Sequence, residues 1–190
     1  TGTFSGNGPT ITGLTIARPG ENLVGLFGVT NSSMITKVGL ENVNISGKYL
    51  VGGLIGESYR STVSDSYATG TVSGSGSIIG GLVGGNHEAT LTRSYATGDV
   101  SGYSYVGGLV GRNEDGSVNT SYATGNVSGS GNIGGLVGDN SVGTVGESYA
   151  TGNVSGSGNI GGLVGNNFGT VLKSNATGAP SRSTSSTRPA

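Results

Sequence analysis

The chain has 190 residues, 41 of them glycine, and contains neither cysteine nor tryptophan. Its formal net charge of −1 gives no electrostatic reason to expect nucleic acid or an anionic membrane surface as a partner. The missing cysteines exclude disulfides, thiolate zinc sites and cysteine nucleophiles. No apolar run approaches the roughly 20 residues of a membrane-spanning helix, so we expect no membrane insertion.

The first part of the chain holds irregular versions of a unit that becomes regular later. It opens with Phe-Ser-Gly-Asn-Gly-Pro-Thr-Ile at 4–11, followed by Val-Gly-Leu-Phe-Gly at 24–28 and an apolar stretch at 40–47. Irregular, more apolar units are typical of the end of a repeat array, where a unit has a neighbour on one side only.

From residue 52 onward, two short motifs and a Thr-Val-like pair return every 26 to 28 residues. Ser-Tyr-Ala-Thr-Gly begins at Ser66, Ser94, Ser121 and Ser148, with a degenerate copy at Ser174. Gly-Gly-Leu-Val-Gly begins at Gly80, Gly107, Gly134 and Gly161, with an isoleucine variant at Gly52. Each unit therefore contains three short apolar pieces separated by turn residues.

This periodicity favours stacked strands over the alternatives. Helix is disfavoured because each glycine in a helix interior costs about 1 kcal/mol. Antiparallel hairpins do not require identical residues to recur, whereas stacked coils do, since equivalent positions lie about 4.8 Å apart. We predict an all-β fold, a parallel β-solenoid (β-helix) of about six coils of ~27 residues with three short strands per coil.

Charged residues at equivalent positions of successive units predict ion pairs between coils. The position before each Ser-Tyr is Asp65, Arg93, Thr120, Glu147 and Lys173 in turn. A second column sets Arg112 beside Asp139. Because stacked like charges would repel, these columns predict the pairs Asp65–Arg93, Glu147–Lys173 and Arg112–Asp139.

Asparagine occupies one equivalent position in four successive units, namely Asn86, Asn113, Asn140 and Asn167. Asparagine tolerates tight-turn conformations, and stacked amides can hydrogen-bond from coil to coil. We interpret this column as a structural asparagine ladder; the alternative is a row of ligand-binding amides.

Alternation within Ala-Thr-Gly-x-Val-Ser predicts one inward and one outward face. The inward set contains Ala68, Gly70 and Val72, and the predicted core ladders are Val72, Val100, Val127, Val154 and Leu82, Leu109, Leu136, Leu163. The outward set forms a candidate binding face, Thr69, Thr97, Thr124, Thr151 and Thr177, beside a column of serines. Such an array resembles the ice-binding faces of some β-solenoid antifreeze proteins; the alternative is a plain solvated strand surface.

The tyrosines Tyr67, Tyr95, Tyr122 and Tyr149 form a further column next to a predicted corner. We interpret this column as aromatic packing, with sugar binding as the alternative.

The recurring Gly-Leu-Val-Gly at 81–84, 108–111, 135–138 and 162–165 resembles the core of the GLUG repeat family. The accompanying Tyr-Ala-Thr-Gly-x-Val-Ser-Gly is similar to that family and to filamentous-haemagglutinin-like adhesin repeats. The resemblance runs from about Thr3 to Gly178. It implies a non-catalytic segment of a large bacterial surface or secreted protein.

Apart from the repeated motifs, the sequence contains no recognisable catalytic or ligand-binding motif. The two G-x-G-x-x-G matches, at 129–134 and 156–161, are followed by no predicted helix that could hold a phosphate. His87 is the single histidine, and we expect it to be exposed in a turn. The acidic residues are scattered singly. We therefore expect no enzyme, no catalytic, cofactor-binding or metal-binding residues, and no cofactor.

These observations predict a solenoid domain at 1–178 and a Ser/Thr/Pro-rich linker or capping tail at 179–190. The expected function is a rigid stalk or a weak repetitive binding surface on a secreted or cell-surface bacterial protein. Expected partners are host or matrix glycans or proteins, or like subunits meeting through the solenoid ends or the tail. The alternatives are an ice-binding solenoid and a polysaccharide-active β-helix enzyme.

Overall fold

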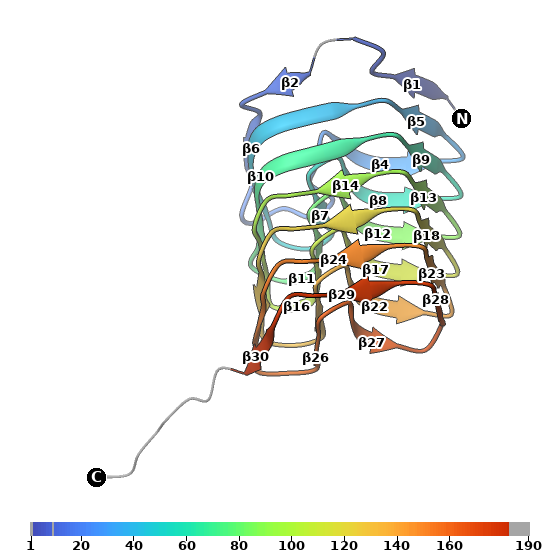
Figure 1. Ribbon diagram of the computed structural model, residues 1–190. Helices are drawn as coiled ribbons and strands as arrows, with labels where there is room; N and C mark the ends of the chain where they lie inside the picture. The colour runs from blue at the N-terminus through green and yellow to red at the C-terminus, as the bar shows by residue number, and fades with distance from the viewer. Residues whose placement is uncertain (1, 9, 183–190) are drawn as a thin grey trace.

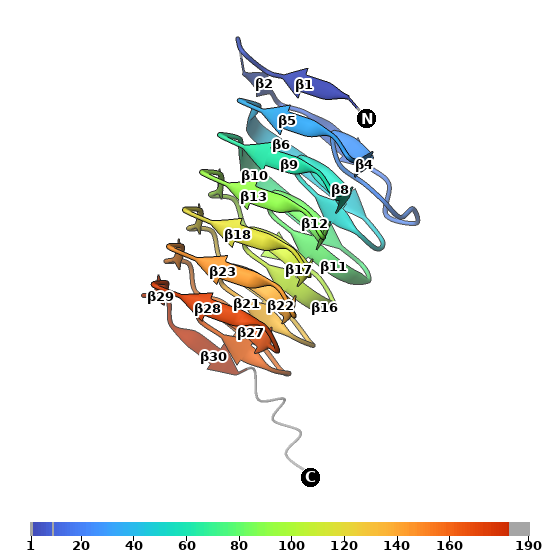
Figure 2. The same cartoon turned by 90° about the vertical axis from the view of Figure 1, so that its right-hand side faces the viewer.

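The computed structural model describes residues 2–8 and 10–182, and its regular structure within these residues is entirely β (Figure 1). The strands run around one axis, and successive turns of the chain stack along it (Figure 2). Within the described residues, no helix is long and apolar enough to cross a membrane. The predicted fold class, an all-β parallel β-solenoid, is confirmed.

Four parallel sheets make the walls of the solenoid, and they are called sheets A to D here. Sheet A contains β1 (Thr3–Ser5), β5 (Met34–Thr36), β9 (Thr62–Ser64), β13 (Thr90–Thr92), β18 (Ser117–Asn119), β23 (Thr144–Gly146) and β28 (Thr170–Leu172). Each of these strands begins one coil, so the coils are numbered 1 to 7 in this order.

Sheet B follows sheet A in every coil and has more pieces, because the chain interrupts it in most coils. Its strands are β2 (Ile11–Thr12), β3 (Thr15–Ala17), β6 (Gly39–Gly47), β10 (Tyr67–Gly74), β14 (Tyr95–Ala96), β15 (Val100–Ser101), β19 (Tyr122–Ala123), β20 (Val127–Gly129), β24 (Tyr149–Ala150), β25 (Val154–Gly156), β29 (Asn175–Ala176) and β30 (Pro180–Arg182).

Sheets C and D complete each coil. Sheet C contains β7 (Val51–Gly52), β11 (Ser77–Gly80), β16 (Ser104–Gly107), β21 (Ile133–Gly134) and β26 (Ile160–Gly161). Sheet D contains β4 (Phe27–Asn31), β8 (Ile55–Tyr59), β12 (Val83–His87), β17 (Val110–Glu114), β22 (Val137–Ser141) and β27 (Val164–Asn167).

Two details of the predicted fold differ from the structure. A coil meets four sheets rather than three, and sheet A counts seven strands rather than about six. The sequence pattern treats Gly-Gly-Leu-Val-Gly as one strand, but in coil 3 strand β11 ends at Gly80 and β12 begins at Val83. The chain turns a corner between them, at Gly81 and Leu82.

Glycine also lets sheets C and D pack with their backbones close together. A Cβ added to Gly111 would lie 2.6 Å from the amide nitrogen of Ile79, and one added to Gly80 would lie 2.7 Å from that of Gly111. Real Cβ atoms do not approach other atoms so closely, so no side chain fits there. The first and last glycines of the repeated Gly-Gly-Leu-Val-Gly therefore determine how closely these two sheets meet.

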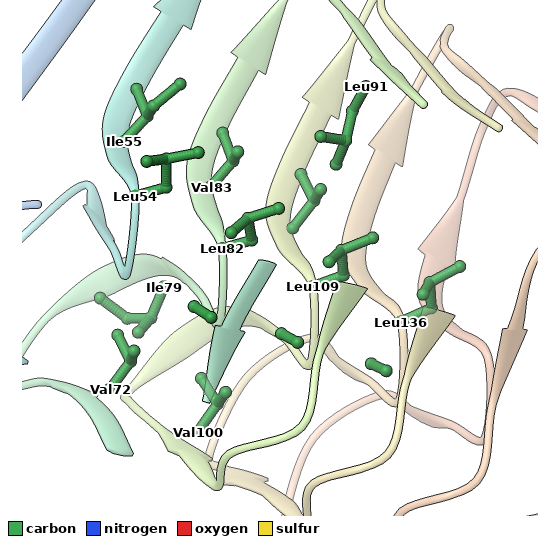
Figure 3. Close-up of a cluster of buried hydrophobic side chains, with 14 of the residues drawn as sticks. Leu54, Ile55, Val72, Ile79, Leu82, Val83, Leu91, Val100, Leu109 and Leu136 are labelled. Atoms are coloured by element: carbon green, nitrogen blue, oxygen red, sulfur yellow. The ribbon is translucent and has the colours of Figure 1, made fainter. Parts of the chain in front are cut away.

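The core is a set of apolar columns that run along the axis (Figure 3). The predicted valine column is buried throughout, from Val72 to Val154, and Leu82, Leu109 and Leu136 are fully buried. Leu163 is only partly buried, because it belongs to the last full turn. Equivalent residues pair directly between coils, for example Val72 with Val100.

The alternation predicted for Ala-Thr-Gly-x-Val-Ser is broken at its glycine. Gly70 has a φ of 109°, and the register of β10 against β6 shifts between Ala68 and Gly70. In coils 4 to 6, the chain bends at Gly98, Gly125 and Gly152. Gly70 is therefore not a regular inward strand residue but lies at an irregularity within β10.

The domain boundary expected at 178 lies within a coil. Pro180–Arg182 of the expected tail form β30, which pairs in parallel with β25. Residues 183–190 of the expected tail lie outside the described residues.

Candidate functional site

Rows of polar side chains run along the solenoid axis, and the first is the asparagine column. Each Nδ2 donates to the Oδ1 of the asparagine in the next coil: Asn86 to Asn113 at 2.7 Å, Asn113 to Asn140 at 2.8 Å and Asn140 to Asn167 at 2.7 Å. The same nitrogen donates to a carbonyl in its own turn, such as Gly116 O at 3.1 Å from Asn113. Asn86, Asn113 and Asn140 are fully buried, so the row closes the corner between sheets D and A and is not open to a ligand there.

A second buried row consists of the serines that begin Ser-Tyr-Ala-Thr-Gly. The backbone N–H of Ser66 donates to Ser94 Oγ at 3.2 Å, and the same contact recurs from Ser94 to Ser121 and from Ser121 to Ser148. Each hydroxyl also donates within its own coil, as Ser94 Oγ does to Thr92 O at 2.9 Å. This role was not predicted from the sequence, although the same serine recurs at 66, 94, 121, 148 and 174.

A third row lies on the surface, at the corner between the two parts of sheet B. The backbone N–H of Asn126 donates to Asp99 Oδ1 at 2.8 Å, and that of Asn153 donates to Asn126 Oδ1 at 3.2 Å. These side chains replace backbone acceptors where the bend interrupts the strand. Their structural role explains why Asp, Asn and Asn follow the glycine.

The tyrosine column is a stack of parallel rings. Successive centroids from Tyr67 to Tyr149 are 4.8, 4.7 and 4.9 Å apart, with interplanar angles of at most 5°. Burial raises the pKa of the Tyr95 and Tyr122 hydroxyls above their ordinary values. The ring faces that a sugar would stack on are covered by neighbouring rings, which favours the packing interpretation.

The structure places the predicted threonine column beside a corner and not on a flat face. Thr97, Thr124, Thr151 and Thr177 are exposed and Thr69 is half-buried. In coils 4 to 6 each threonine comes directly after the last residue of its strand and before the bend. The serine column begins beyond that bend, so the two columns do not form the flat array that the sequence suggested.

Sheet A carries the more regular hydroxyl surface. Its strands pair without a register shift, and the first residue of each strand aligns with the next: Thr62 with Thr90, Thr90 with Ser117, Ser117 with Thr144. The third residues form a parallel column that carries hydroxyls at Thr36, Ser64 and Thr92 and continues as Asn119, Gly146 and Leu172. We call these two columns the hydroxyl strip; sequence reasoning missed it because the strands are only three residues long.

Ion pairs border the hydroxyl strip. Arg93 forms a bidentate pair with Asp65 at 2.7 and 2.8 Å, and Lys173 lies 3.6 Å from Glu147. Arg93 lowers the pKa of the Asp65 carboxyl through its hydrogen bond. On the other side, Arg60 pairs with Glu88 at 2.8 and 3.1 Å. Two of the ion pairs predicted from the columns are thus present here; being exposed, each contributes little to stability.

Sheet D carries an ionic row that contradicts the expectation of singly scattered acids. His87 lies 3.1 Å from Glu57 and 3.1 Å from Glu114. Arg112 continues the row, with Glu114 at 3.2 Å and Asp139 at 3.5 Å. Asn166 Nδ2 then donates to Asp139 Oδ1 at 2.7 Å, so the row joins coils 2 to 6. The Arg112–Asp139 pair is the third ion pair that the columns predicted.

His87 was expected to be exposed, and that expectation is wrong. Its side chain is 20% exposed, and its ring stacks on Tyr59 with centroids 5.0 Å apart. The carboxylates that flank it come from the coils before and after, two residues apart in strand position. Glu114 is the direct register partner of His87, whereas Glu57 aligns with Gly85 and reaches His87 diagonally.

The ionic row has little free capacity for chemistry, because its charged groups already pair with one another. Among residues 2–8 and 10–182, no cluster of three or more His, Cys, Asp or Glu side chains is arranged to hold a metal ion.

The model of the GLUG motif family matches residues 47–73, 75–101 and 102–128. The chain contains tandem GLUG repeats. Each matched segment is one full turn of the solenoid that begins near the start of sheet C and ends in sheet B. The Gly-Leu pair of the GLUG motif forms the corner between sheets C and D.

A protein named halomucin, from Haloquadratum walsbyi (strain DSM 16790 / HBSQ001), is 42% identical to the chain over 79 residues. The match covers 41% of this chain and 1% of halomucin, so the chain corresponds to a very small part of that relative. No solved structure matches the chain.

Packing inside the solenoid explains why Gly-Leu-Val-Gly and Tyr-Ala-Thr-Gly occur together in each GLUG repeat. A Cβ added to Gly81 would lie 2.8 Å from the Cβ of Ala96, and one added to Gly108 would lie 2.8 Å from that of Ala123. The middle glycine of one motif thus faces the alanine of the other across the narrow interior. Either residue could enlarge only if the other moved.

The asparagine ladder ends at an unpaired acceptor, which leads to a prediction. Asn86 Oδ1 is buried without a hydrogen-bond partner, and the equivalent residue of the preceding coil is Ser58. Ser58→Asn should extend the ladder, because its Nδ2 would donate to Asn86 Oδ1. We expect a gain of about 1 kcal/mol in the free energy of unfolding, measured by urea denaturation. Ser58→Ala should give no gain; equal stability of both variants would contradict the prediction.

Proposed function

We propose that this chain is a structural repeat module of a surface-associated protein, acting as a stiff spacer between other parts of that protein. The carrying observation is that the side-chain rows bind each coil to the next along the same axis as the backbone ladders. The GLUG repeats and the similarity to part of a protein called halomucin support a repetitive surface module.

A non-enzymatic role is part of this proposal. The charged side chains of the ionic row pair with one another, and the asparagine and serine rows are buried. An adhesive role would then rest on weak contacts repeated along the exposed hydroxyls and charges, with glycans or proteins as partners.

Pulling the chain from its two ends in a force spectrometer tests the spacer role. A stiff spacer should resist extension and then unfold in discrete steps, because the rows must break coil by coil. Smooth, entropic stretching from the start would contradict the proposal. A glycan array probed with the fluorescently labelled chain tests the adhesive role separately, since a stalk without adhesive contacts leaves the array unlabelled.

Ice binding is a second candidate, and the hydroxyl strip is the observation that favours it. Its first column repeats about every 4.8 Å along the axis, and on β9 and β13 a second hydroxyl lies about 7 Å away on the same strand. If the strip binds ice, the purified chain should show thermal hysteresis that Thr144→Lys abolishes. Thr124→Lys, in the corner column, should leave it unchanged. No hysteresis in the wild-type chain would exclude this candidate.

A further inference from the structure

Three Asn-x-Ser sequences share one column on the surface of sheet B. Asn126 and Asn153 belong to the surface row described above, and Asn44 lies in the same column, in coil 2. The sequences are Asn-Ile-Ser at 44–46 and Asn-Val-Ser at 126–128 and 153–155. All three asparagines are exposed, and so is Ser128. Asn-x-Ser is the sequence at which exported proteins receive N-linked glycans.

The hydrogen bonds of this column depend mainly on the amide oxygens. Asn126 Oδ1 accepts from the backbone N–H of Asn153, and Asn153 Oδ1 accepts from that of Ala179, both at 3.2 Å. Asn126 Nδ2 donates to Asp99 Oδ1 at 3.2 Å. An asparagine amide has two N–H groups, so a glycosylated side chain keeps its oxygen and one N–H. These contacts can therefore persist after a sugar is attached.

The buried asparagine ladder uses its amides differently. Asn113 Nδ2 donates to Asn140 Oδ1 at 2.8 Å and to Gly116 O at 3.1 Å, so both of its hydrogens are engaged. A sugar on that nitrogen would break one of these bonds and would find no space, because Asn113 is fully buried. None of the four ladder asparagines has Ser or Thr two residues later. Between these two columns, the attachment sequence occurs where an Nδ2 hydrogen is dispensable.

We propose that Asn44, Asn126 and Asn153 are attachment sites for N-linked glycans along one side of the solenoid. The donor is a lipid-linked glycosyl diphosphate. Nδ2 forms a bond to the anomeric carbon, the bond from that carbon to the diphosphate oxygen breaks, and the diphosphate leaves with the electron pair. Nδ2 gives one proton to a base of the transferase. The spacer role does not depend on these glycans and would stand without them.

The positions of the three sites limit how many glycans one molecule carries. Asn126 and Asn153 are in adjacent coils, about 4.8 Å apart along the axis, so two glycans there would compete for the same space. We expect one glycan on that pair and one on Asn44. Asn-x-Ser/Thr also occurs at Asn31 and Asn175, in the first and last coils and outside this column.

The sequence Asn-Thr-Ser at 119–121 serves as an internal control. Ser121 is buried, and its hydroxyl donates to Asn119 O at 2.7 Å and accepts from the N–H of Ser94 at 3.2 Å. Asn119 is half-buried, and its Oδ1 lies close over Gly146 of the next coil, 2.5 Å from the place of an added Cβ. The hydroxyl and the amide of this sequence are thus held by the fold, so Asn119 should stay unmodified.

Glycan transfer to the purified, folded chain tests the proposal, with an oligosaccharyl transferase and a short lipid-linked oligosaccharide. The transferase is chosen because it modifies both asparagines of a synthetic peptide covering residues 117–130. On the folded chain, mass spectrometry of peptides should locate glycans at Asn44 and at Asn126 or Asn153, and none at Asn119. Ser128→Ala should confine modification of the adjacent pair to Asn153. Equal modification of Asn119 and Asn126 would overturn the proposal, as would a folded chain left unmodified at all three sites.

Urea unfolding of the modified chain gives a second readout. The modified and unmodified chains should have the same urea midpoint, because the contacts through Oδ1 persist. A clear fall of the midpoint on modification would contradict the proposed compatibility of the glycans with the fold.

Discussion

Gly108→Ala should destabilise the solenoid by about 3 kcal/mol or more, because the added methyl group has no space. It would overlap the carbonyl oxygen of Gly135 in the next coil and lie 2.8 Å from Ala123 Cβ. Neither neighbour is the end of a flexible side chain, so relief requires the backbones of two coils to separate. Thermal and urea unfolding of the purified variant would measure the loss.

Gly85→Ala is the matched control for this substitution. Gly85 belongs to the same repeat and is also buried, but an added Cβ would meet Leu50 Cδ2 at 3.1 Å and Glu57 Cγ at 3.4 Å. Side-chain atoms of this kind can shift by a few tenths of an ångström. The loss should therefore stay near or below about 1 kcal/mol. Similar losses at the two positions would show that glycine matters for chain flexibility and not for close contact between coils.

Asn113→Ala should have the next largest effect, about 3 kcal/mol, because Asn113 occupies the middle of a buried row. Its Oδ1 accepts from Asn86 at 2.7 Å, and its Nδ2 donates to Asn140 at 2.8 Å and to Gly116 O at 3.1 Å. Removal of this side chain leaves buried polar groups unpaired on both sides. Each buried group without a partner costs about 1–3 kcal/mol.

An exposed amide pair of the same chemistry serves as the control. Asn159 Nδ2 donates to Asn132 Oδ1 at 3.0 Å across one coil, but Asn159 is exposed. Water can replace that bond, so Asn159→Ala should cost less than about 0.5 kcal/mol. If Asn113→Ala were equally mild, the buried row would not be what holds the corner together.

The contacts within one column could be predicted from the sequence. Asp65 with Arg93, Arg112 with Asp139 and the asparagine row all join equivalent residues of adjacent coils. In a solenoid, residues that are one repeat apart in the sequence lie next to each other in adjacent coils. That relation holds wherever the coil length is constant.

Contacts between different columns could not be predicted in this way. The approach of sheets C and D and the fit of Gly108 against Ala123 depend on the angles of the corners. Corner angles arise from the packing of the whole coil, and no local motif specifies them. For the same reason, the sequence pattern suggested three strands per coil where the chain passes through four sheets.

The sequence by itself thus determined the parallel β-solenoid, its repeat length and which residues stack on their equivalents, because these follow from periodicity along one axis. Only the tertiary structure decided what lies opposite and diagonal to each residue. In the structure, the threonine column lies beside a corner and not on a flat face; its members are Thr69, Thr97, Thr124, Thr151 and Thr177. The tertiary structure also brought a histidine expected in solvent between two carboxylates. The physical reason is that the same stacking contact recurs in every coil and is therefore visible as a period in the sequence. The shape of the cross-section depends on the packing of the whole coil, which no single motif specifies.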